Sequence, residues 1–187
     1  MSDTAHRAHR GGDASPWVMR WAASLPAGAR VLDLACGSGR NARWLAAQGF
    51  VVRAVDRDAE ALAGLAGVPG ISTRQADLEG APWPLVGETF DAVVVCRYLH
   101  RPLFPQILAT VTPGGLLIYE TFMLGNEQYG RPSRPEFLLA PGELAALANK
   151  AGWAIEGLRE GVESIDAADA SHKAVTQSIC ARKPVTA

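Results

Sequence analysis

The chain has 187 residues, of which 48% are hydrophobic and 20% charged, and its formal net charge is −1. This is the composition of an ordinary globular domain, and the lack of positive charge argues against a nucleic acid as partner. No apolar run approaches the roughly 20 residues that span a membrane. The first residues contain no apolar signal segment, so we expect one cytoplasmic domain over residues 1–187.

The predicted elements begin after a polar tail, residues 1–14, which we expect to be flexible. Ser15 and Pro16 suit an N-cap and a first helical residue, and they predict a helix that ends before Pro26. Apolar strands and helical stretches then alternate along the chain. We predict strands at 31–35, 50–55, 70–75, 90–96 and 116–122, and helices at 38–48, 58–65 and 103–111.

Repeated strand–helix alternation predicts an α/β fold with a single doubly wound, mostly parallel sheet and helices on both faces. Right-handed crossovers bring the carboxyl ends of the strands to one edge, where ligands bind. Residues 122–140 are rich in glycine and proline, and we expect this long loop to form a lid over a substrate. A helix at 141–151 and strands at 153–162 and 175–182 complete the prediction.

The most informative segment is VLDLACGSGR, residues 31–40, in which an apolar strand carrying Asp33 runs into a glycine-rich turn. Gly37 and Gly39 have no Cβ, so a ligand can approach the backbone closely there. The start of the next helix adds unpaired N–H groups and the positive end of the helix dipole. The segment therefore predicts a nucleotide-type binding site.

Two classes of nucleotide fit this turn. The Gly-x-Gly-x-x-Ala spacing from Gly37 to Ala42, with Asp56 at the end of the second strand, fits NAD(P) and hence an oxidoreductase. Asp33 argues against that class, because a pyrophosphate would bring negative charge close to a carboxylate. Asp77 follows the third strand, and three such acids suit a ligand with a cationic end, a ribose diol and an exocyclic amine.

Together these motifs resemble those of the class I S-adenosylmethionine-dependent methyltransferases. VLDLACGSG matches the first motif of that family, FDAV at 90–93 matches the fourth-strand motif, and PGG at 113–115 matches the turn before the fifth strand. The resemblance implies seven strands with the last antiparallel, S-adenosylmethionine as cofactor, and in-line methyl transfer to a small-molecule acceptor. A non-catalytic module that keeps the cofactor pocket is a further alternative.

The resemblance also implies a role for each residue around the cofactor. Asp56 would accept from both ribose hydroxyls, Asp77 from the adenine amine with Leu78 beside the ring, and the Cys96 carbonyl from the methionine amino group. The glycines would admit the methionine portion, which Asp33 would orient. The full predicted cofactor set is Asp33, Ala35, Cys36, Gly37, Gly39, Arg40, Asp56, Arg57, Asp77, Leu78 and Cys96.

Candidate acceptor residues follow the fourth and fifth strands. His100 could act as a general base if the acceptor must lose a proton, and Tyr98 could pack against the acceptor or form a hydrogen bond to it. A helix cap at His100 and solvated arginines are equally weighted alternatives. We predict His100 and Tyr98 as catalytic residues and Arg97, Arg101, Tyr129 and Arg131 as substrate-binding residues.

Three further patterns bear on the acceptor and on metals. The segment after the fifth strand is similar to small bacterial methyltransferases of the tellurite-resistance type, which implies a small, soft acceptor such as a thiol, selenium or tellurium compound. CRYL at 96–99 replaces the Asn/Asp-Pro-Pro-aromatic pattern of amino-group methylases, which argues against amines of DNA bases. The three cysteines lack CxxC spacing, so neither a disulfide framework nor a zinc site is predicted.

Overall fold

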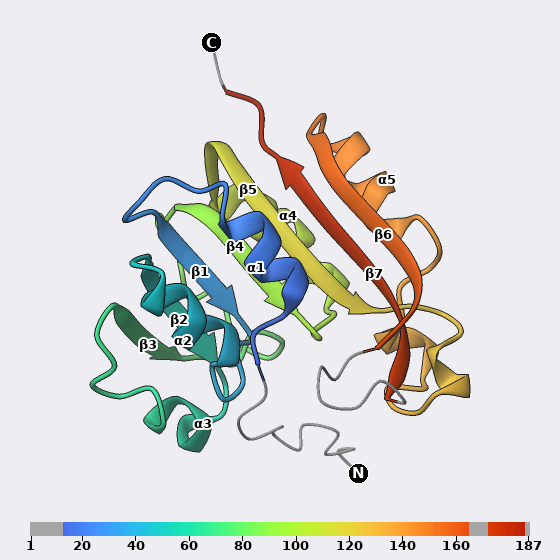
Figure 1. The fold of residues 1–187 in the computed structure, drawn as a ribbon, viewed down its shortest axis with the longest axis horizontal. Helices are drawn as coiled ribbons and strands as arrows, with labels where there is room; N and C mark the ends of the chain where they lie inside the picture. The colour runs from blue at the N-terminus through green and yellow to red at the C-terminus, as the bar shows by residue number, and fades with distance from the viewer. Residues whose placement is uncertain (1–12, 165–171, 186–187) are drawn as a thin grey trace.

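The structure is a computed structural model that describes residues 13–164 and 172–185. Seven strands form one sheet in the order β3-β2-β1-β4-β5-β7-β6 (Figure 1). Strand β7 is antiparallel to both of its neighbours, and the other pairings are parallel, which confirms the predicted α/β fold. The strands are β1 Arg30–Leu34, β2 Val51–Asp56, β3 Ile71–Gln75, β4 Phe90–Cys96, β5 Val111–Phe122, β6 Ala154–Ser164 and β7 Lys173–Arg182.

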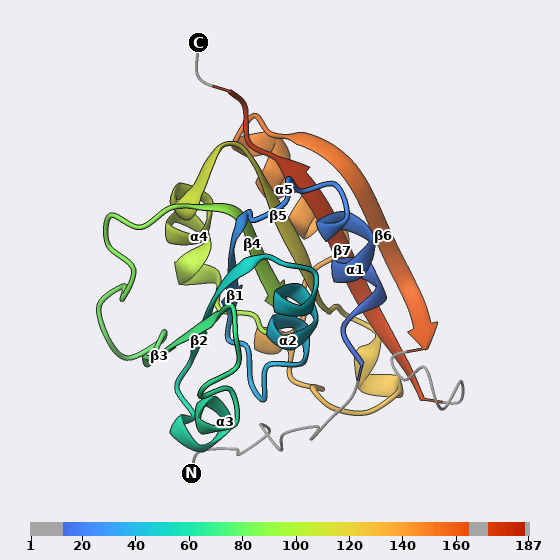
Figure 2. The same ribbon diagram turned by 60° about the vertical axis from the view of Figure 1, so that its left-hand side comes forward.

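Helices cover both faces of the sheet, as Figures 1 and 2 show. Helices α1 (Pro16–Ala22), α2 (Arg40–Ala47) and α3 (Ala59–Ala63) bury residues against one face, and α4 (Phe104–Thr110) and α5 (Glu143–Lys150) against the other. Strand β4 is apolar on both faces, which is why it can lie at the centre of the sheet. No helix in the two described ranges is long and apolar enough to cross a membrane.

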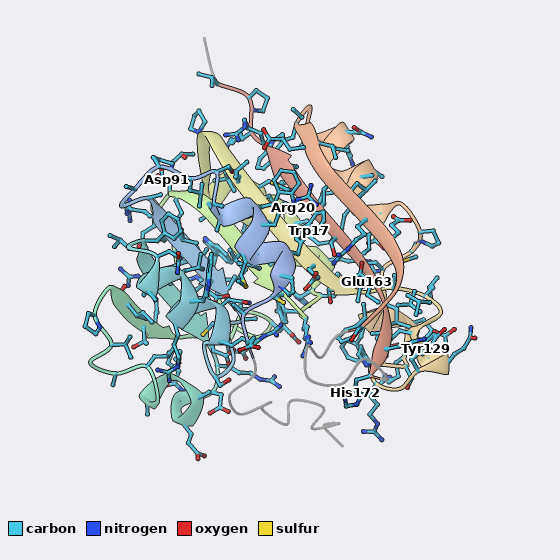
Figure 3. The ribbon with its side chains drawn as sticks, viewed as in Figure 1. Trp17, Arg20, Asp91, Tyr129, Glu163 and His172 are labelled. Carbon is cyan, nitrogen blue, oxygen red and sulfur yellow. The ribbon has the colours of Figure 1, made fainter. Side chains whose placement is uncertain are left out.

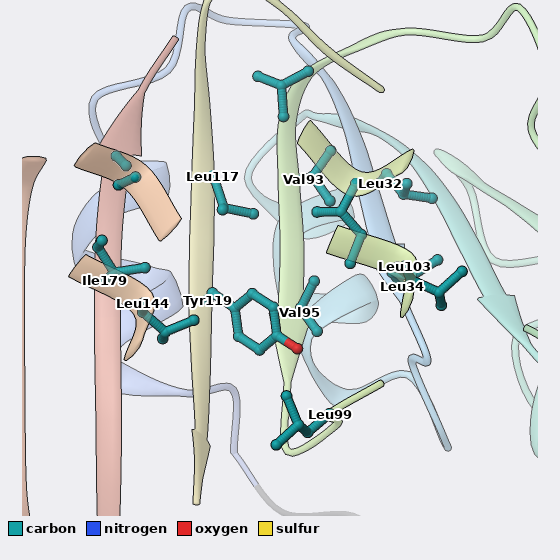
Figure 4. Packing of buried hydrophobic residues seen from close by; sticks show 14 of the residues in the cluster. Leu32, Leu34, Val93, Val95, Leu99, Leu103, Leu117, Tyr119, Leu144 and Ile179 are labelled. Atoms are coloured by element: carbon teal, nitrogen blue, oxygen red, sulfur yellow. The ribbon is translucent and has the colours of Figure 1, made fainter. Parts of the chain in front are cut away.

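The core on the α4–α5 face is built from alternate residues of the central strands (Figure 4). Tyr119 of β5 is fully buried in this core, and its hydroxyl donates to the Tyr98 carbonyl at 2.8 Å. A buried tyrosine hydroxyl needs a partner, and here that partner is the backbone just beyond β4. The core therefore fixes the position of the chain that leaves β4 at the carboxyl edge.

Two boundaries differ from the prediction. Strand β5 begins at Val111 rather than at Leu116, and its first part is irregular: Gly114 keeps a φ of 78°, and the pairing with β4 passes from Val111 directly to Leu116. The Gly114 N–H donates to the Lys183 carbonyl at 3.0 Å, and the Lys183 N–H donates to Gly115 at 2.9 Å, so this segment lies beside the chain that follows β7. At the other end of the molecule Ala14 is 7% exposed, so the predicted tail does not include it; residues 1–12 lie outside the described range.

The predicted lid loop, residues 122–140, is held at its base and along its length. The Leu124 N–H donates to the Leu139 carbonyl at 2.9 Å, which closes the base of the loop. Asn126 is 1% exposed; its amide donates to the Pro132 carbonyl and accepts from the Val175 N–H of β7. Two short 3₁₀ turns, Asn126–Gln128 and Pro135–Phe137, shape the remainder. The loop therefore lies fixed at the end of β5.

Candidate functional site

The glycine-rich turn after β1 has the conformation that its sequence predicts. Gly37 and Gly39 have φ values of 55° and 77°, and Ala35 adopts a φ of 54° that a residue with a Cβ rarely takes. A Cβ on Gly39 would lie 2.5 Å from Leu65 Cδ1, whereas a Cβ on Gly37 would meet no atom within 4 Å. Packing therefore requires glycine at position 39, and the turn leaves open space at position 37.

Asp56, the last residue of β2, is tied to this turn. Its Oδ2 accepts from the Gly37 N–H at 2.7 Å, and its Oδ1 accepts from the Asp58 N–H at 2.9 Å. The residue is 3% exposed. A carboxylate can accept further hydrogen bonds beside these two, since each oxygen has about two acceptor positions. The carboxylate is thus held rigidly by the backbone in a way that suits a ribose diol.

Asp33 has the least complete hydrogen bonding of the acids at the site. It is 1% exposed; the Ala42 N–H donates to its carboxylate, and Oδ2 has no hydrogen-bond partner among the described residues. Burial raises the pKa of Asp33 to about 7, against the opposing effects of the Ala42 N–H and of Arg40. An unpartnered buried carboxylate oxygen calls for a donor or a cation, so the residues present fit a ligand with a cationic end.

Asp77 lies two residues beyond β3 in an exposed turn. Its Oδ1 accepts from the Glu79 N–H at 3.0 Å and from the Gly80 N–H at 3.1 Å, and these bonds lower the pKa of its carboxyl group. The carboxylate is therefore charged, and its Oδ2 remains for a ligand amine. Leu78 beside it is buried in the core, and Arg57 is exposed.

Arg40 and Cys96 connect the start of α2 with the end of β4. Arg40 Nη2 lies 3.2 Å from Cys96 Sγ, and Arg40 Nη1 donates to the Asp13 carbonyl at 2.9 Å. Burial, with a contribution from Glu120, raises the pKa of the Cys96 thiol to about 11, so the thiol is neutral at pH 7. These contacts place Cys96, as predicted, beside the β1–α2 turn.

The predicted catalytic residues lie near the turn that follows β3. The Tyr98 hydroxyl is buried close to the Glu79 carboxylate, and burial together with that carboxylate raises the pKa of Tyr98. His100 contributes to the lowered pKa of Asp77, and its side chain does not cap the following 3₁₀ turn. His100 is the N-cap residue of that turn through its backbone alone, so its side chain makes no capping hydrogen bond. Arg97 has a φ of 57° and donates its N–H to the Glu120 carbonyl at 2.8 Å.

Arg101 is a clamp between the chain after β4 and the lid loop. Its Nε and Nη2 donate to the Glu143 carboxylate at 2.6 and 2.9 Å, and its other bonds go to the carbonyls of Glu136 and Leu138. These bonds use the guanidinium to hold the lid loop and α5 against the chain after β4. They therefore favour a structural role for Arg101 over binding of the acceptor. Tyr129 and Arg131 are exposed on the lid loop, and Figure 3 shows Tyr129 far from Asp91 at the start of β4.

The sequence analysis missed Glu120, which lies near the end of β5. The Ser15 hydroxyl donates to its Oε1 at 2.8 Å, and the Ser178 hydroxyl donates to its Oε2 at 3.2 Å. Arg159 lies 3.5 Å from Oε2, and 14% of the Glu120 side chain is exposed. An acid inside the apolar run LLIYETF was the available signal, since a charge in a buried strand calls for a partner or a function.

Comparisons with known proteins agree with this geometry. Residues 31–115 match the family model described as a methyltransferase domain. The chain is 34% identical over 117 residues to the ribosomal RNA small subunit methyltransferase C of Chromohalobacter salexigens, which covers 54% of this chain and 34% of that protein. It is 31% identical over 115 residues to YqeM of Bacillus subtilis, which is named as a methyltransferase, with 56% and 47% covered. The chain thus spans less than half of the length of these two relatives.

The fold is shared with solved structures. TehB from Haemophilus influenzae superposes with a TM-score of 0.75 at 23% sequence identity, over 91% of this chain and 62% of that one. Residues 31–115 therefore resemble a methyltransferase domain, and the chain has the same fold as TehB. S-adenosylmethionine is the methyl donor that this family implies, and the comparisons favour it over the dinucleotide that the glycine spacing alone left open.

Proposed function

We propose that this protein is an S-adenosylmethionine-dependent methyltransferase that acts on a small-molecule acceptor. The single observation that carries the proposal is the arrangement of Asp33, Gly37 and Asp56. A buried acid with an unpartnered oxygen and a second, rigidly held acid lie on either side of a turn that is open at Gly37. This arrangement suits a ligand with a cationic end and a ribose.

The donor supplies a methyl group on a positively charged sulfur, which is already activated for displacement. Catalysis by the protein then consists largely of holding the two reactants in line. Asp56 would fix the ribose, Asp77 the adenine amine, and Asp33 the charged methionine end. Cys96 and Arg40 would close the site on the β4 side, where the carbonyl of Cys96 is the predicted acceptor for the amino group.

A small acceptor is supported by the compact lid and by the charge. The lid loop, residues 122–140, is fixed to β7 through Asn126 and to the chain after β4 through Arg101, so it is held at the end of β5. The net charge of −1 does not favour a polynucleotide, although one relative is named for ribosomal RNA. The resemblance to tellurite-resistance methyltransferases also supports a small acceptor.

Transfer of a labelled methyl group tests the proposal. The purified chain would be incubated with methyl-labelled S-adenosylmethionine and a panel of thiols, selenium and tellurium oxyanions, amines and phenols, with a structured RNA as comparison. We expect label in at least one small compound and none in the RNA. Saturable donor binding with no transfer to any compound would indicate the non-catalytic module instead, and label only in RNA would contradict the small-acceptor proposal.

A further inference from the structure

Glu120 occupies the position next to the donor site along the sheet edge. The ends of β2, β1 and β4 carry Asp56, Asp33 and Cys96, and β5 is the next strand in the sheet order. Cys96 and Glu120 are register partners, and the Cys96 thiol lies 3.7 Å from Glu120 Oε1. If the donor lies over β2, β1 and β4, as the proposed function requires, Glu120 is the acid that an acceptor beside the donor would meet.

The Glu120 carboxylate is fixed by groups from four other parts of the chain. The Ser15 hydroxyl before α1 donates to Oε1 at 2.8 Å, and the Ser178 hydroxyl of β7 donates to Oε2 at 3.2 Å. The Cys96 thiol of β4 contacts Oε1 at 3.7 Å, and Arg159 of β6 lies 3.5 Å from Oε2. The thiol is the weakest of these donors, so its contact is the one that a ligand could replace most easily.

Among the described residues, the charged side chain that contacts Glu120 is Arg159 of β6, whereas Ser15 and Ser178 contribute neutral hydroxyl groups. Arg159 is held by an ion pair with Glu163 on its own strand, and its guanidinium lies 5.1 Å from the centre of the Trp17 ring of α1. Arg40 of α2 contacts Cys96 rather than Glu120. Arg159 therefore interacts with two carboxylates, so its positive charge is not available to Glu120 alone. A mostly buried carboxylate whose charge is not fully compensated lowers the stability of the fold, because burial removes its hydration.

We propose that Glu120 contacts the methyl acceptor, and that the acceptor presents an amine or hydroxyl group to it. The nucleophilic nitrogen or oxygen would donate its hydrogen to Glu120, in place of the Cys96 thiol contact. The bond between sulfur and methyl breaks with its electron pair going to sulfur, and the new bond joins the methyl to nitrogen or oxygen. The N–H or O–H proton passes to the Glu120 carboxylate and then to water. This proposal rests on the proposed function and narrows its acceptor.

Glu120→Gln separates this role from a structural one. Glutamine keeps the shape and can still accept a hydrogen bond from a serine hydroxyl, but it has no negative charge and cannot take up a proton. We expect turnover with an amine or hydroxyl acceptor to fall by about 100-fold or more. Donor affinity, measured by titration calorimetry, should stay within about twofold, since no donor contact is lost. Glu156→Gln is the matched control, because Glu156 pairs with Arg182 at the other end of β6.

The acceptor class is tested without knowledge of the natural acceptor. Small primary amines, phenols and alcohols, thiols, and tellurite would each be added to the protein with S-adenosylmethionine to measure methyl transfer, and with the demethylated donor to measure the melting temperature. Amines or hydroxyl compounds should be methylated or should raise the melting temperature of the wild type and not of Glu120→Gln. The proposal is overturned if only thiols or tellurite act, if no compound acts, or if Glu120→Gln keeps wild-type turnover.

The two proposals fail in different ways. Absence of donor binding by the wild type would remove the proposed function, whatever Glu120 does. Normal donor binding and normal transfer by Glu120→Gln would leave the methyltransferase intact and remove only the role of Glu120. Loss of donor affinity or of folding in Glu120→Gln, beyond that in Glu156→Gln, would assign Glu120 to the donor site or to the fold and would also overturn the acceptor proposal.

Discussion

The Gly37 N–H donates to Asp56 Oδ2 at 2.7 Å, and this bond joins the glycine-rich turn after β1 to the last residue of β2. The two residues are the predicted contacts for the methionine portion and the ribose of one ligand. Because the same carboxylate also accepts from the Asp58 N–H, the acid is positioned before any ligand arrives. Preorganisation of this kind lowers the ordering cost of binding.

Asp56→Ala should weaken donor binding by at least about 10-fold, because each hydrogen bond to a charged group contributes roughly 1.5–3 kcal/mol. The free energy of unfolding should fall as well, since two backbone N–H groups lose their partner. Titration calorimetry and chemical unfolding measure the two effects. Asp58→Ala is the control: it removes the cap of α3 but keeps the N–H that Asp56 accepts, so it should lower stability alone.

Gly39→Ala should mainly lower stability, whereas Gly37→Ala should mainly lower donor affinity. A Cβ at position 39 meets Leu65 Cδ1 at 2.5 Å, so we expect a loss of about 1–3 kcal/mol of unfolding free energy from overpacking. A Cβ at position 37 meets nothing within the protein and would fill the space of the ligand, but the φ of 55° there strains a residue with a Cβ by about 1–2 kcal/mol. Gly37→Ala should therefore reduce donor affinity and should lower stability only by this strain. Wild-type donor affinity in Gly37→Ala would place the ligand elsewhere.

The stability of the protein should depend on pH through Asp33. Its pKa is raised from 3.8 to about 7 by burial, so the folded state keeps a proton that the unfolded state loses as the pH rises above about 4. The raised pKa therefore leaves the free energy of unfolding unchanged at pH values below about 4. It lowers that free energy increasingly as the pH rises to about 7. Asp33→Asn should gain stability relative to wild type as the pH rises from 5 to 7, measured by urea unfolding. A pH-independent difference would contradict the raised pKa.

Binding of the donor should be coupled to the protonation of the Asp33 carboxyl group. A cationic methionine end beside Asp33 favours the charged carboxylate, so binding near pH 6 should release a proton. Calorimetric titration in buffers with different ionisation enthalpies measures this release. Asp33→Asn should bind the donor more weakly and release no proton. Equal proton release by wild type and Asp33→Asn would assign the effect to another group.

The Arg101–Glu143 clamp should stabilise the lid without affecting the donor. Both side chains are partly exposed, so we expect a coupling of about 1 kcal/mol in a double-mutant cycle of alanine variants. Donor affinity should match wild type in all three variants. A normal unfolding free energy in Arg101→Ala, combined with a raised KM for the acceptor, would instead restore the acceptor-binding role that the sequence suggested.

The alternating pattern predicted most of the fold because each strand and helix carries its own periodicity and caps. Ser15 caps α1 as predicted, and the glycine-rich turn lies where the residues place it. The predicted start of β5 was wrong, because the irregular stretch through PGG is held by bonds to Lys183 near the other end of the chain. A local pattern carries no information on such a contact.

The range of the interactions also explains which candidate site residues the sequence can predict. Asp33, Asp56 and Asp77 follow from short motifs at strand ends. Glu120 was missed because its partners are brought to it by the pairing of β5 with β7 and of β7 with β6, across separations of 58 residues to Ser178 and 39 to Arg159. Arg101 was assigned to the acceptor because nothing local shows that Glu143, 42 residues later, returns to it.

The central claim is that the turn between β1 and α2 binds S-adenosylmethionine. Calorimetric titration of the wild type and of Asp56→Ala with S-adenosylmethionine, and separately with NAD, tests it most directly. The account predicts saturable binding of S-adenosylmethionine at one site per chain, much weaker binding in Asp56→Ala, and no binding of NAD. Tight binding of NAD without binding of S-adenosylmethionine would contradict it.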